Sequence, residues 1–91
     1  MDTPLEPHDE YFSRENLYSL GTDRDSGSHY LSIPVSAGPF DYEEYYRLDD
    51  ELYARFLADP AAAIAFAWEC RRQEHDDLLL EKARENRGTA I

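Results

Sequence analysis

The stretch Tyr30-Leu31-Ser32-Ile33-Pro34-Val35-Ser36 decides the fold, because large apolar residues alternate in it with serine and proline. Leu31, Ile33 and Val35 fall on one side of an extended chain, and the small residues fall on the other. Such a period of two is typical of a half-buried β-strand. Pro34 cannot donate a ladder hydrogen bond, so we expect it at an edge, at a bulge or at a position outside the ladder.

Two further strand-like segments flank this stretch, and turn-forming residues separate them from it. Residues 16–20 come before it, and the Asp-, Ser- and Gly-rich residues 22–28 predict a hairpin loop. After the turn at residues 37–39, residues 40–48 alternate again and place four residues in one apolar row: Phe40, Tyr42, Tyr46 and Leu48. Glu44 falls in the same row, which predicts either a wet rim there or a different register.

Two helices are expected after the strands. Asp49 or Asp50 is a suitable N-cap for a helix that runs to Ala58, and Asp59-Pro60 suits the start of a second helix. The apolar stripe of the first helix is Leu52, Tyr53, Phe56 and Leu57, and that of the second is Ile64, Trp68, His75 and Leu79. Phe56, Phe66 and Trp68 are expected in the core, where aromatic residues compensate for the few large aliphatic ones.

The second helix has two possible ends. We expect it to reach about Gln73, and the helix-forming residues 81–84 favour its continuation to Arg84. Alternatively, Asp76-Asp77 ends the helix and Leu78-Leu79-Leu80 forms a last strand.

The order of these elements predicts an α+β fold, in which a three-stranded antiparallel β-meander is followed by two helices packed on one face. A chain of 91 residues allows one small domain. We assign residues 1–15 to a flexible acidic N-terminal arm, residues 16–85 to a single α+β domain and residues 86–91 to a C-terminal tail.

The charge of the chain restricts its partners. Twenty Asp and Glu residues against nine Lys and Arg residues give a net charge of −11. Direct nucleic-acid binding needs the opposite sign, and so does binding to an anionic membrane surface. The first residues do not resemble a signal peptide and no apolar run is long enough to span a bilayer, so a cytoplasmic location is expected. The single cysteine, Cys70, is expected to be a small buried residue in a reducing compartment.

The most acidic segment is expected to form a docking surface for a basic protein partner. Strand alternation places Asp41, Glu43 and Tyr45 on one surface, and the following helix start adds Asp49, Asp50 and Glu51 nearby. Carboxylates there would steer a basic partner, and tyrosines would supply rigid contact area. The alternative is a solvated face that only keeps the chain soluble.

No catalytic or metal-binding constellation stands out in the sequence. None of the three histidines pairs with a Ser or Cys in a recognisable nucleophile setting, and His75 has no second ligand at a spacing of four. Residues 23–27 differ from a calcium loop, since Gly27 comes one place early and Pro34 occupies the twelfth position. We therefore expect no enzymatic activity, no cofactor and no metal.

Taken together, the acidic composition, the strand at 30–36, the tyrosine- and acid-rich strand from Asp41 to Tyr46 and the two trailing helices resemble the immunity proteins of bacterial toxin–immunity systems. The resemblance implies a non-enzymatic inhibitor that neutralises a basic toxin or effector, such as a nuclease. Two alternatives stay open. One is a DNA-mimic regulator of a nucleic-acid-binding protein, and the other is a small homodimeric accessory or structural subunit.

Overall fold

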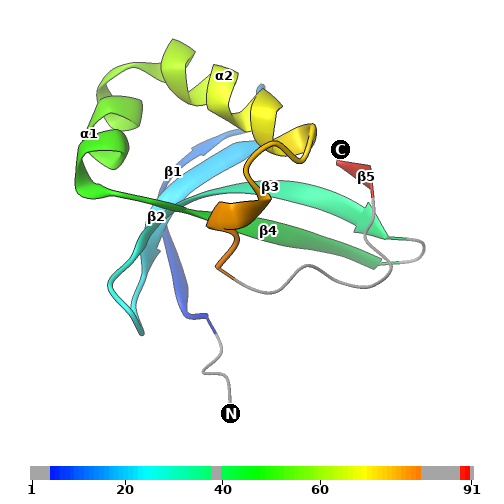
Figure 1. The fold of residues 1–91 in the computed structure, drawn as a ribbon, viewed down its shortest axis with the longest axis horizontal. Coiled ribbons are helices and arrows are strands. Elements are labelled where there is room, and N and C mark those ends of the chain that lie inside the picture. The colour runs from blue at the N-terminus through cyan, green and yellow to red at the C-terminus, as the bar shows by residue number, and fades with distance from the viewer. Residues whose placement is uncertain (1–4, 38–39, 81–88, 91) are drawn as a thin grey trace.

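The computed structural model describes residues 5–37, 40–80 and 89–90, and it shows one antiparallel sheet with two helices over one face (Figure 1). Four strands lie side by side in chain order: β1 (Pro7–Ser13), β2 (Tyr18–Asp23), β3 (His29–Ala37) and β4 (Phe40–Leu48). They are followed by α1 (Asp50–Ala58), α2 (Pro60–Arg71), the 3₁₀ turn η1 (Asp76–Leu78) and the short strand β5 (Thr89–Ala90), which pairs with β3. None of the helices in the described part of the chain is long and apolar enough to span a bilayer.

The α+β class is therefore confirmed, but the meander has four strands and not three. Residues 7–13, which we assigned to an N-terminal arm, form β1 and pair with β2 from Pro7 opposite Asp23 to Ser13 opposite Tyr18. A shift in register between Asp9 and Tyr11 marks a bulge at Glu10. Backbone groups form the hydrogen bonds of the ladder, so an edge strand can pair without large apolar side chains. The polar strand β1 therefore lacks the apolar alternation by which a half-buried strand is recognised in a sequence. Of the expected tail at 86–91, Thr89–Ala90 belong to β5 and the rest lies outside the described residues.

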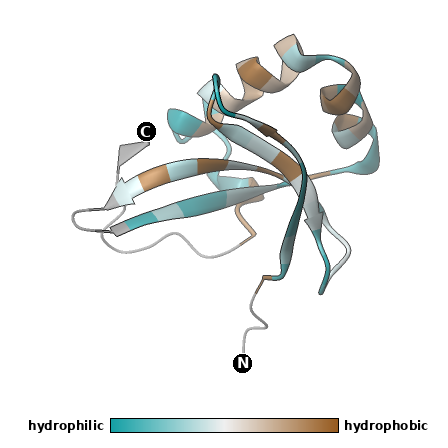
Figure 2. Ribbon diagram, turned by 180° about the vertical axis from the view of Figure 1, so that it is seen from behind, coloured by the Kyte–Doolittle hydropathy of each residue, from teal (hydrophilic) through white to brown (hydrophobic). Residues whose placement is uncertain are grey.

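The expected faces of the central strand are confirmed. Leu31, Ile33 and Val35 are buried at 2% exposure or less and belong to one core with residues of both helices. Figure 2 shows hydrophobic segments in the sheet and in the helices that cover it. Pro34 lies opposite Glu43 on the other face. The register of β4 also agrees with the pattern, since Tyr46 and Leu48 are buried and Tyr42 is half-buried. The side chain of Phe40 lies outside the described part of the structure.

Glu44 lies in the apolar row and is buried, so it does not mark a wet rim. Its Oε1 accepts a hydrogen bond of 2.9 Å from the Tyr46 hydroxyl, which also lies 3.3 Å from the carbonyl oxygen of Cys70. A buried carboxylate is costly unless hydrogen bonds compensate for its lost hydration. The hydrogen bond from the Tyr46 hydroxyl therefore compensates for part of the hydration that Glu44 loses beneath α2.

The first helix begins and ends as expected. Asp49 is its N-cap, and the Asp49 carboxylate accepts a hydrogen bond of 2.7 Å from the backbone N–H of Leu52. Tyr53 and Phe56 are buried, whereas Leu57, expected in the same stripe, is 44% exposed.

The second helix is rotated relative to the expected stripe. Its buried residues are Ala63, Phe66, Ala67 and Cys70, and Trp68 is 55% exposed. Phe66 packs against Phe56 at 5.2 Å between ring centroids, so two of the three aromatic residues expected in the core are there and Trp68 is not. The two alanines explain the rotation, because small side chains let the helix backbone approach the sheet closely.

The end of α2 lies close to Gln73, the first of the two expected ends, and not at Asp76-Asp77, which belong to η1. The helix ends at Arg71, and Gln73 has a left-handed φ of 62°, which an α-helix does not continue through. Leu79 then forms an isolated bridge with Tyr46, and Leu80 N–H donates to the Tyr45 carbonyl oxygen at 2.9 Å. Residues 79–80 therefore lie strand-like along the outer edge of β4, while residues 81–84 lie outside the described part of the chain.

The close packing of β1 and Tyr30 around Gly21 on β2 can be tested by substituting this glycine. A Cβ atom on Gly21 would overlap both the His8 carbonyl oxygen and the Tyr30 hydroxyl. We expect Gly21→Ala to lower the free energy of unfolding by about 1–3 kcal/mol, as overpacking does elsewhere. Urea denaturation of the variant measures this loss. Wild-type stability in Gly21→Ala would show that the contacts around Gly21 are looser than described.

A buried aspartate ties β1 to the turn between β2 and β3. Asp23 is 3% exposed, and its carboxylate accepts hydrogen bonds from Glu6 N–H (2.8 Å), the Ser26 hydroxyl (2.7 Å) and two N–H groups of the turn. Burial alone would raise the pKa of Asp23, but these hydrogen bonds outweigh it and hold the pKa below the ordinary value of 3.8.

We therefore expect Asp23 to stabilise the fold at neutral pH and to lose this effect in acid. Its depressed pKa makes its contribution complete above the unfolded-state pKa of 3.8, and the contribution disappears as the pH falls through the lower folded-state value. Asp23→Asn should cost about 1–2 kcal/mol at pH 7 and flatten the acid limb of the stability curve. Asp25→Asn, in the same turn but exposed, is the control. Parallel pH–stability curves for Asp23→Asn and wild type down to pH values of about 3 would contradict this role.

Candidate protein-binding surface

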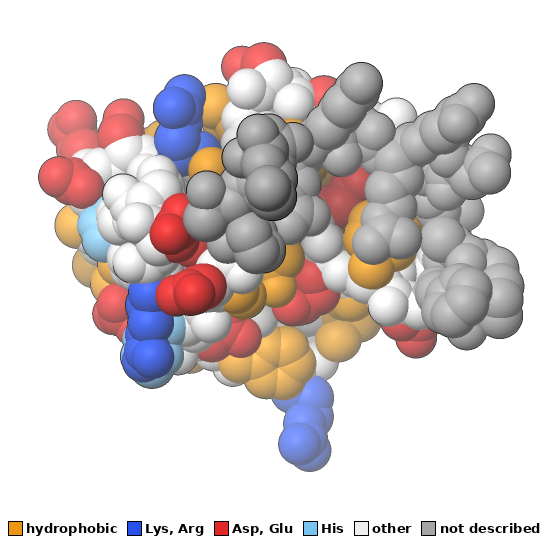
Figure 3. Space-filling view, turned by 90° about the horizontal axis from the view of Figure 1, so that it is seen from below, with side chains coloured by type: hydrophobic (Ala, Val, Ile, Leu, Met, Phe, Trp, Pro, Cys, Tyr) orange, Lys and Arg blue, Asp and Glu red, His pale blue; other side chains and the backbone are white. Residues whose placement is uncertain are grey.

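The face of the sheet turned away from the helices, here the open face, carries polar and aromatic side chains. Strand register places Asp9, Gly21, Tyr30 and Arg47 in one row across it, and Ser19, Ser32 and Tyr45 in the next. Figure 3 views the molecule from this side and shows acidic side chains dispersed among apolar ones.

Two tyrosines on the open face each donate a hydrogen bond to a carboxylate. The Tyr30 hydroxyl donates to Asp9 Oδ1 in a short hydrogen bond, and the Tyr45 hydroxyl donates to Glu43 Oε2 at 3.1 Å. The two rings are in edge-to-face contact, with centroids 4.9 Å apart and planes at 88°. We refer to Asp9, Tyr30, Glu43 and Tyr45 as the tyrosine–carboxylate cluster.

The phenols of this cluster orient the carboxylates by donating hydrogen bonds to them. Burial raises the pKa of Tyr30 well above its ordinary value, and the hydrogen bond to Asp9 and the Asp9 charge raise it further. Tyr30 therefore stays a neutral donor at physiological pH. Neither Asp9 nor Glu43 forms an ion pair with another residue of the described ranges.

The six residues expected to form the docking surface fall into two groups. Asp41, Glu43 and Tyr45 share the open face, as the alternation predicts. Asp49, Asp50 and Glu51 are exposed at the opposite end of β4, where α1 begins. Asp49 follows Asp41 by eight residue steps of extended chain, which is roughly 26 Å at about 3.3 Å per step. The two groups do not form one compact patch.

The second group also stabilises the start of α1. Asp49 caps the helix, and Asp50 lies 3.2 Å from Nε2 of His29. The His29 ring stacks on Tyr53 at 4.0 Å with parallel planes, and its Nδ1 is 2.9 Å from the Thr22 hydroxyl. Burial, followed by the Glu10 charge, raises the pKa of Tyr53 to about 12, so Tyr53 is neutral as well. These contacts join α1 to the sheet, although all three acids of the group are exposed.

Metal and thiol chemistry find little support in this arrangement. Within residues 5–37, 40–80 and 89–90, no three His, Cys, Asp or Glu side chains are grouped so as to hold a metal ion. Cys70 is buried as expected, and burial raises the pKa of its thiol far above the ordinary value. It therefore stays an unreactive thiol on the buried side of α2.

Sequence reasoning missed two members of the cluster. Tyr30 lies in phase with Ser32 and out of phase with Leu31, so its place on the open face was readable from the alternation. Asp9 gave no such signal, because it belongs to a polar edge strand that was assigned to the N-terminal arm.

Comparison with known proteins does not place the chain in a family. No protein-family model matches the sequence, no curated protein matches it, and no solved structure matches the fold. The function is inferred below from the geometry of the chain itself.

The cluster makes a testable contribution to stability. Tyr30→Phe removes the donor that joins β3 to Asp9 on β1, and we expect it to lower the free energy of unfolding by about 1–2 kcal/mol. Tyr45→Phe is the matched control, because Tyr45 and Glu43 lie on the same strand and are both half-buried, so water can replace their hydrogen bond. Urea denaturation at neutral pH distinguishes the two variants. Equal losses in the two would show that the Tyr30–Asp9 hydrogen bond does not hold β1 to the sheet.

Proposed function

We propose that this chain is a non-enzymatic inhibitor of the immunity-protein type, which neutralises a basic toxin or effector by binding it through the open face. One observation carries the proposal: two carboxylates on this face, Asp9 and Glu43, each accept a hydrogen bond from a tyrosine hydroxyl, and neither forms an ion pair with another described residue. Lys or Arg side chains of a partner would form ion pairs with these carboxylates.

Such an arrangement suits recognition because the acidic groups are oriented before binding. A carboxylate already held by a hydrogen bond loses little conformational freedom when a guanidinium or ammonium group binds it. The ring of Tyr45, which is half-buried, adds rigid apolar area beside the charges, and the buried Tyr30 ring supports it from below. Tyrosine is enriched at the energetic centres of protein interfaces. The cluster therefore places oriented carboxylates and aromatic contact area side by side.

The surrounding charges give the interaction a direction. Asp41 is exposed on the same strand face, and the net charge of −11 attracts a basic partner over longer distances. Arg47 lies in register with Tyr30 on this face, so a partner's cations would dock on the Asp9 and Glu43 side and not beside Arg47. Association should therefore be fast at low salt and slower as salt screens the charges.

The test begins with capture of the partner from a lysate of the source organism at low salt, followed by purification of that partner. We expect a basic enzyme, whose activity the chain inhibits at stoichiometric concentration. Asp9→Asn/Glu43→Gln should weaken binding about tenfold or more and reduce its dependence on salt. The control is Asp25→Asn/Asp59→Asn, which changes the net charge equally at exposed positions of the β2–β3 turn and the α1–α2 junction.

Three results would contradict the proposal. One is that the two double variants bind the partner equally, since the cluster would then have no role. Another is that the captured partner keeps its full activity when the chain is bound. The third is recovery of the chain alone as a stable dimer, which would favour the accessory-subunit alternative.

A further inference from the structure

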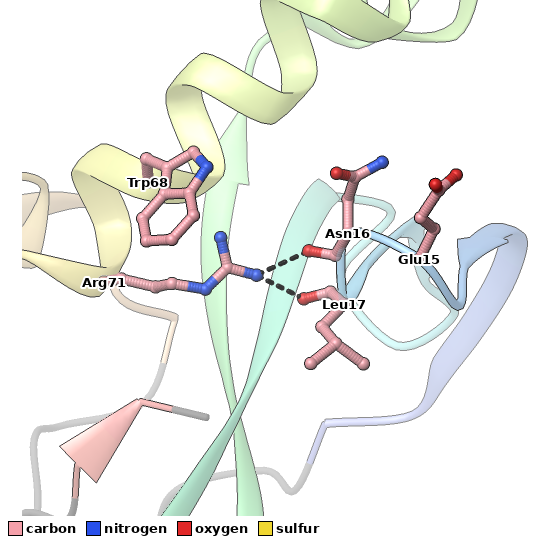
Figure 4. A pocket seen from close by; sticks show the side chains of 5 residues that line it. All are labelled: Glu15, Asn16, Leu17, Trp68 and Arg71. Atoms are coloured by element: carbon pink, nitrogen blue, oxygen red, sulfur yellow. Dashed lines mark hydrogen bonds between the residues drawn. The ribbon is translucent and has the colours of Figure 1, made fainter.

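A small pocket lies between α2 and the turn that joins β1 to β2. It has a volume of about 130 Å³ and is lined by Glu15, Asn16, Leu17, Trp68 and Arg71 (Figure 4). Trp68 is 55% exposed at its rim, which is unusual for the largest apolar side chain in the protein. No residue of the tyrosine–carboxylate cluster takes part in it.

Arg71 is the chemically distinctive group of the pocket. One of its nitrogens, Nη2, donates to the carbonyl oxygens of Asn16 at 2.6 Å and Leu17 at 2.8 Å, and these bonds hold a turn in which Leu17 has a left-handed φ of 52°. The guanidinium carbon lies 4.9 Å from the centroid of the Trp68 ring. Its other nitrogens make no hydrogen bond to another residue of the described ranges, and Figure 4 shows Nη1 pointing away from the two carbonyls.

The charge of Arg71 is also not matched by an acid. Arg71 is half-buried, yet it forms no ion pair with another described residue, in a chain with eleven excess negative charges. Arg72, its neighbour, is exposed and paired with Glu74. A half-buried guanidinium with free donors is most strongly satisfied by a carboxylate, which it can bind through two parallel hydrogen bonds.

The apolar side of the pocket defines the rest of the ligand. Leu17 and the Trp68 indole line a space that matches a single aliphatic side chain, since a cavity of about 150 Å³ accommodates one benzene molecule. The 4.9 Å between guanidinium and indole is short enough for one residue to contact both through its carboxylate and its side chain. A chain-terminal residue carries these two groups on the same Cα, whereas an internal Asp or Glu carries a carboxylate without an apolar branch.

We propose that this pocket binds the C-terminal carboxylate of a partner polypeptide whose last residue is a medium-sized aliphatic one. Arg71 binds the carboxylate, and Leu17 and Trp68 enclose the side chain. Glu15 lines the same pocket and repels a second negative charge, so a dicarboxylate fits poorly. The site goes beyond the open-face inhibitor proposed above and does not depend on it.

The single tryptophan of the chain makes the site directly observable. Trp68 fluorescence reports on the pocket alone, because no other tryptophan contributes to it. The probes are the tetrapeptide Ala-Ala-Ala-Leu with a free C-terminal carboxylate, the same peptide as its C-terminal amide, and N-acetylleucine. We expect a saturable change in Trp68 emission with the free-acid peptide, and binding of the amide weaker by about tenfold or more.

Variants separate recognition by Arg71 from its role in the turn. Arg71→Gln should weaken binding of the free-acid peptide about tenfold or more, and Arg72→Gln, the matched neighbour, should leave it unchanged. Because Arg71→Gln also removes the hydrogen bonds to the turn, Glu15→Gln supplies a second measurement that keeps Arg71. It removes the repulsion and should bind the free-acid peptide at least as tightly as wild type.

Several results would overturn the proposal. Equal responses to the acid and the amide would show that Arg71 does not recognise a carboxylate, and so would a loss of binding in Glu15→Gln that matches the loss in Arg71→Gln. The absence of a saturable response to any probe would remove the site. If N-acetylleucine bound as tightly as the peptide, the pocket would be a site for small carboxylic acids and not for a polypeptide end.

Discussion

The absence of a side chain at Gly21 is the constraint on which the open face depends. Tyr30 lies in register with Gly21, and its hydroxyl occupies space that any Cβ atom at this position would need. Only with that space free does the phenol reach across β2 to Asp9 on β1. Tyr30 is completely buried, although it lies on the face that the two helices do not cover. Gly21 therefore links the outermost strand to the aromatic centre of the open face and to one of the two carboxylates of the cluster.

The acidic residues of this chain divide according to what surrounds them. Asp23, Glu44 and Asp49 accept hydrogen bonds that hold the turn, the core and the start of α1, so their charge is used inside the fold. Asp9 and Glu43 accept theirs from the phenols of Tyr30 and Tyr45, on the face of the sheet that the two helices do not cover. Net charge alone does not distinguish these two uses. The distinction is whether the hydrogen bond holds a turn, the core or a helix start, or joins a carboxylate to a phenol on this face.

The sequence was most informative where a local rule decides the structure. Alternation identified the faces of β3 and β4, and the cap residue and Asp59-Pro60 identified where both helices begin. It was least informative where an element is defined by its neighbour. The polar strand β1 exists because β2 offers a ladder, and α2 is rotated because Ala63 and Ala67 allow close contact with the sheet, which hides Cys70 and exposes Trp68. For the same reason, half of the tyrosine–carboxylate cluster was predictable from strand parity, while Asp9 and the pocket beside Arg71 required the tertiary structure.

The position of β1 gives the open face a second property. As the outermost strand it has β2 as its sheet neighbour on one side, so it can detach without breaking the ladders that join β2, β3 and β4. Detachment of β1 would carry Asp9 away from Tyr30 and dismantle the cluster while the helices and the core stayed folded. A molecule that binds the cluster therefore binds only the state with β1 attached, and its binding energy adds directly to the protection of that strand. Binding at the open face and the attachment of β1 to the sheet would therefore be thermodynamically coupled.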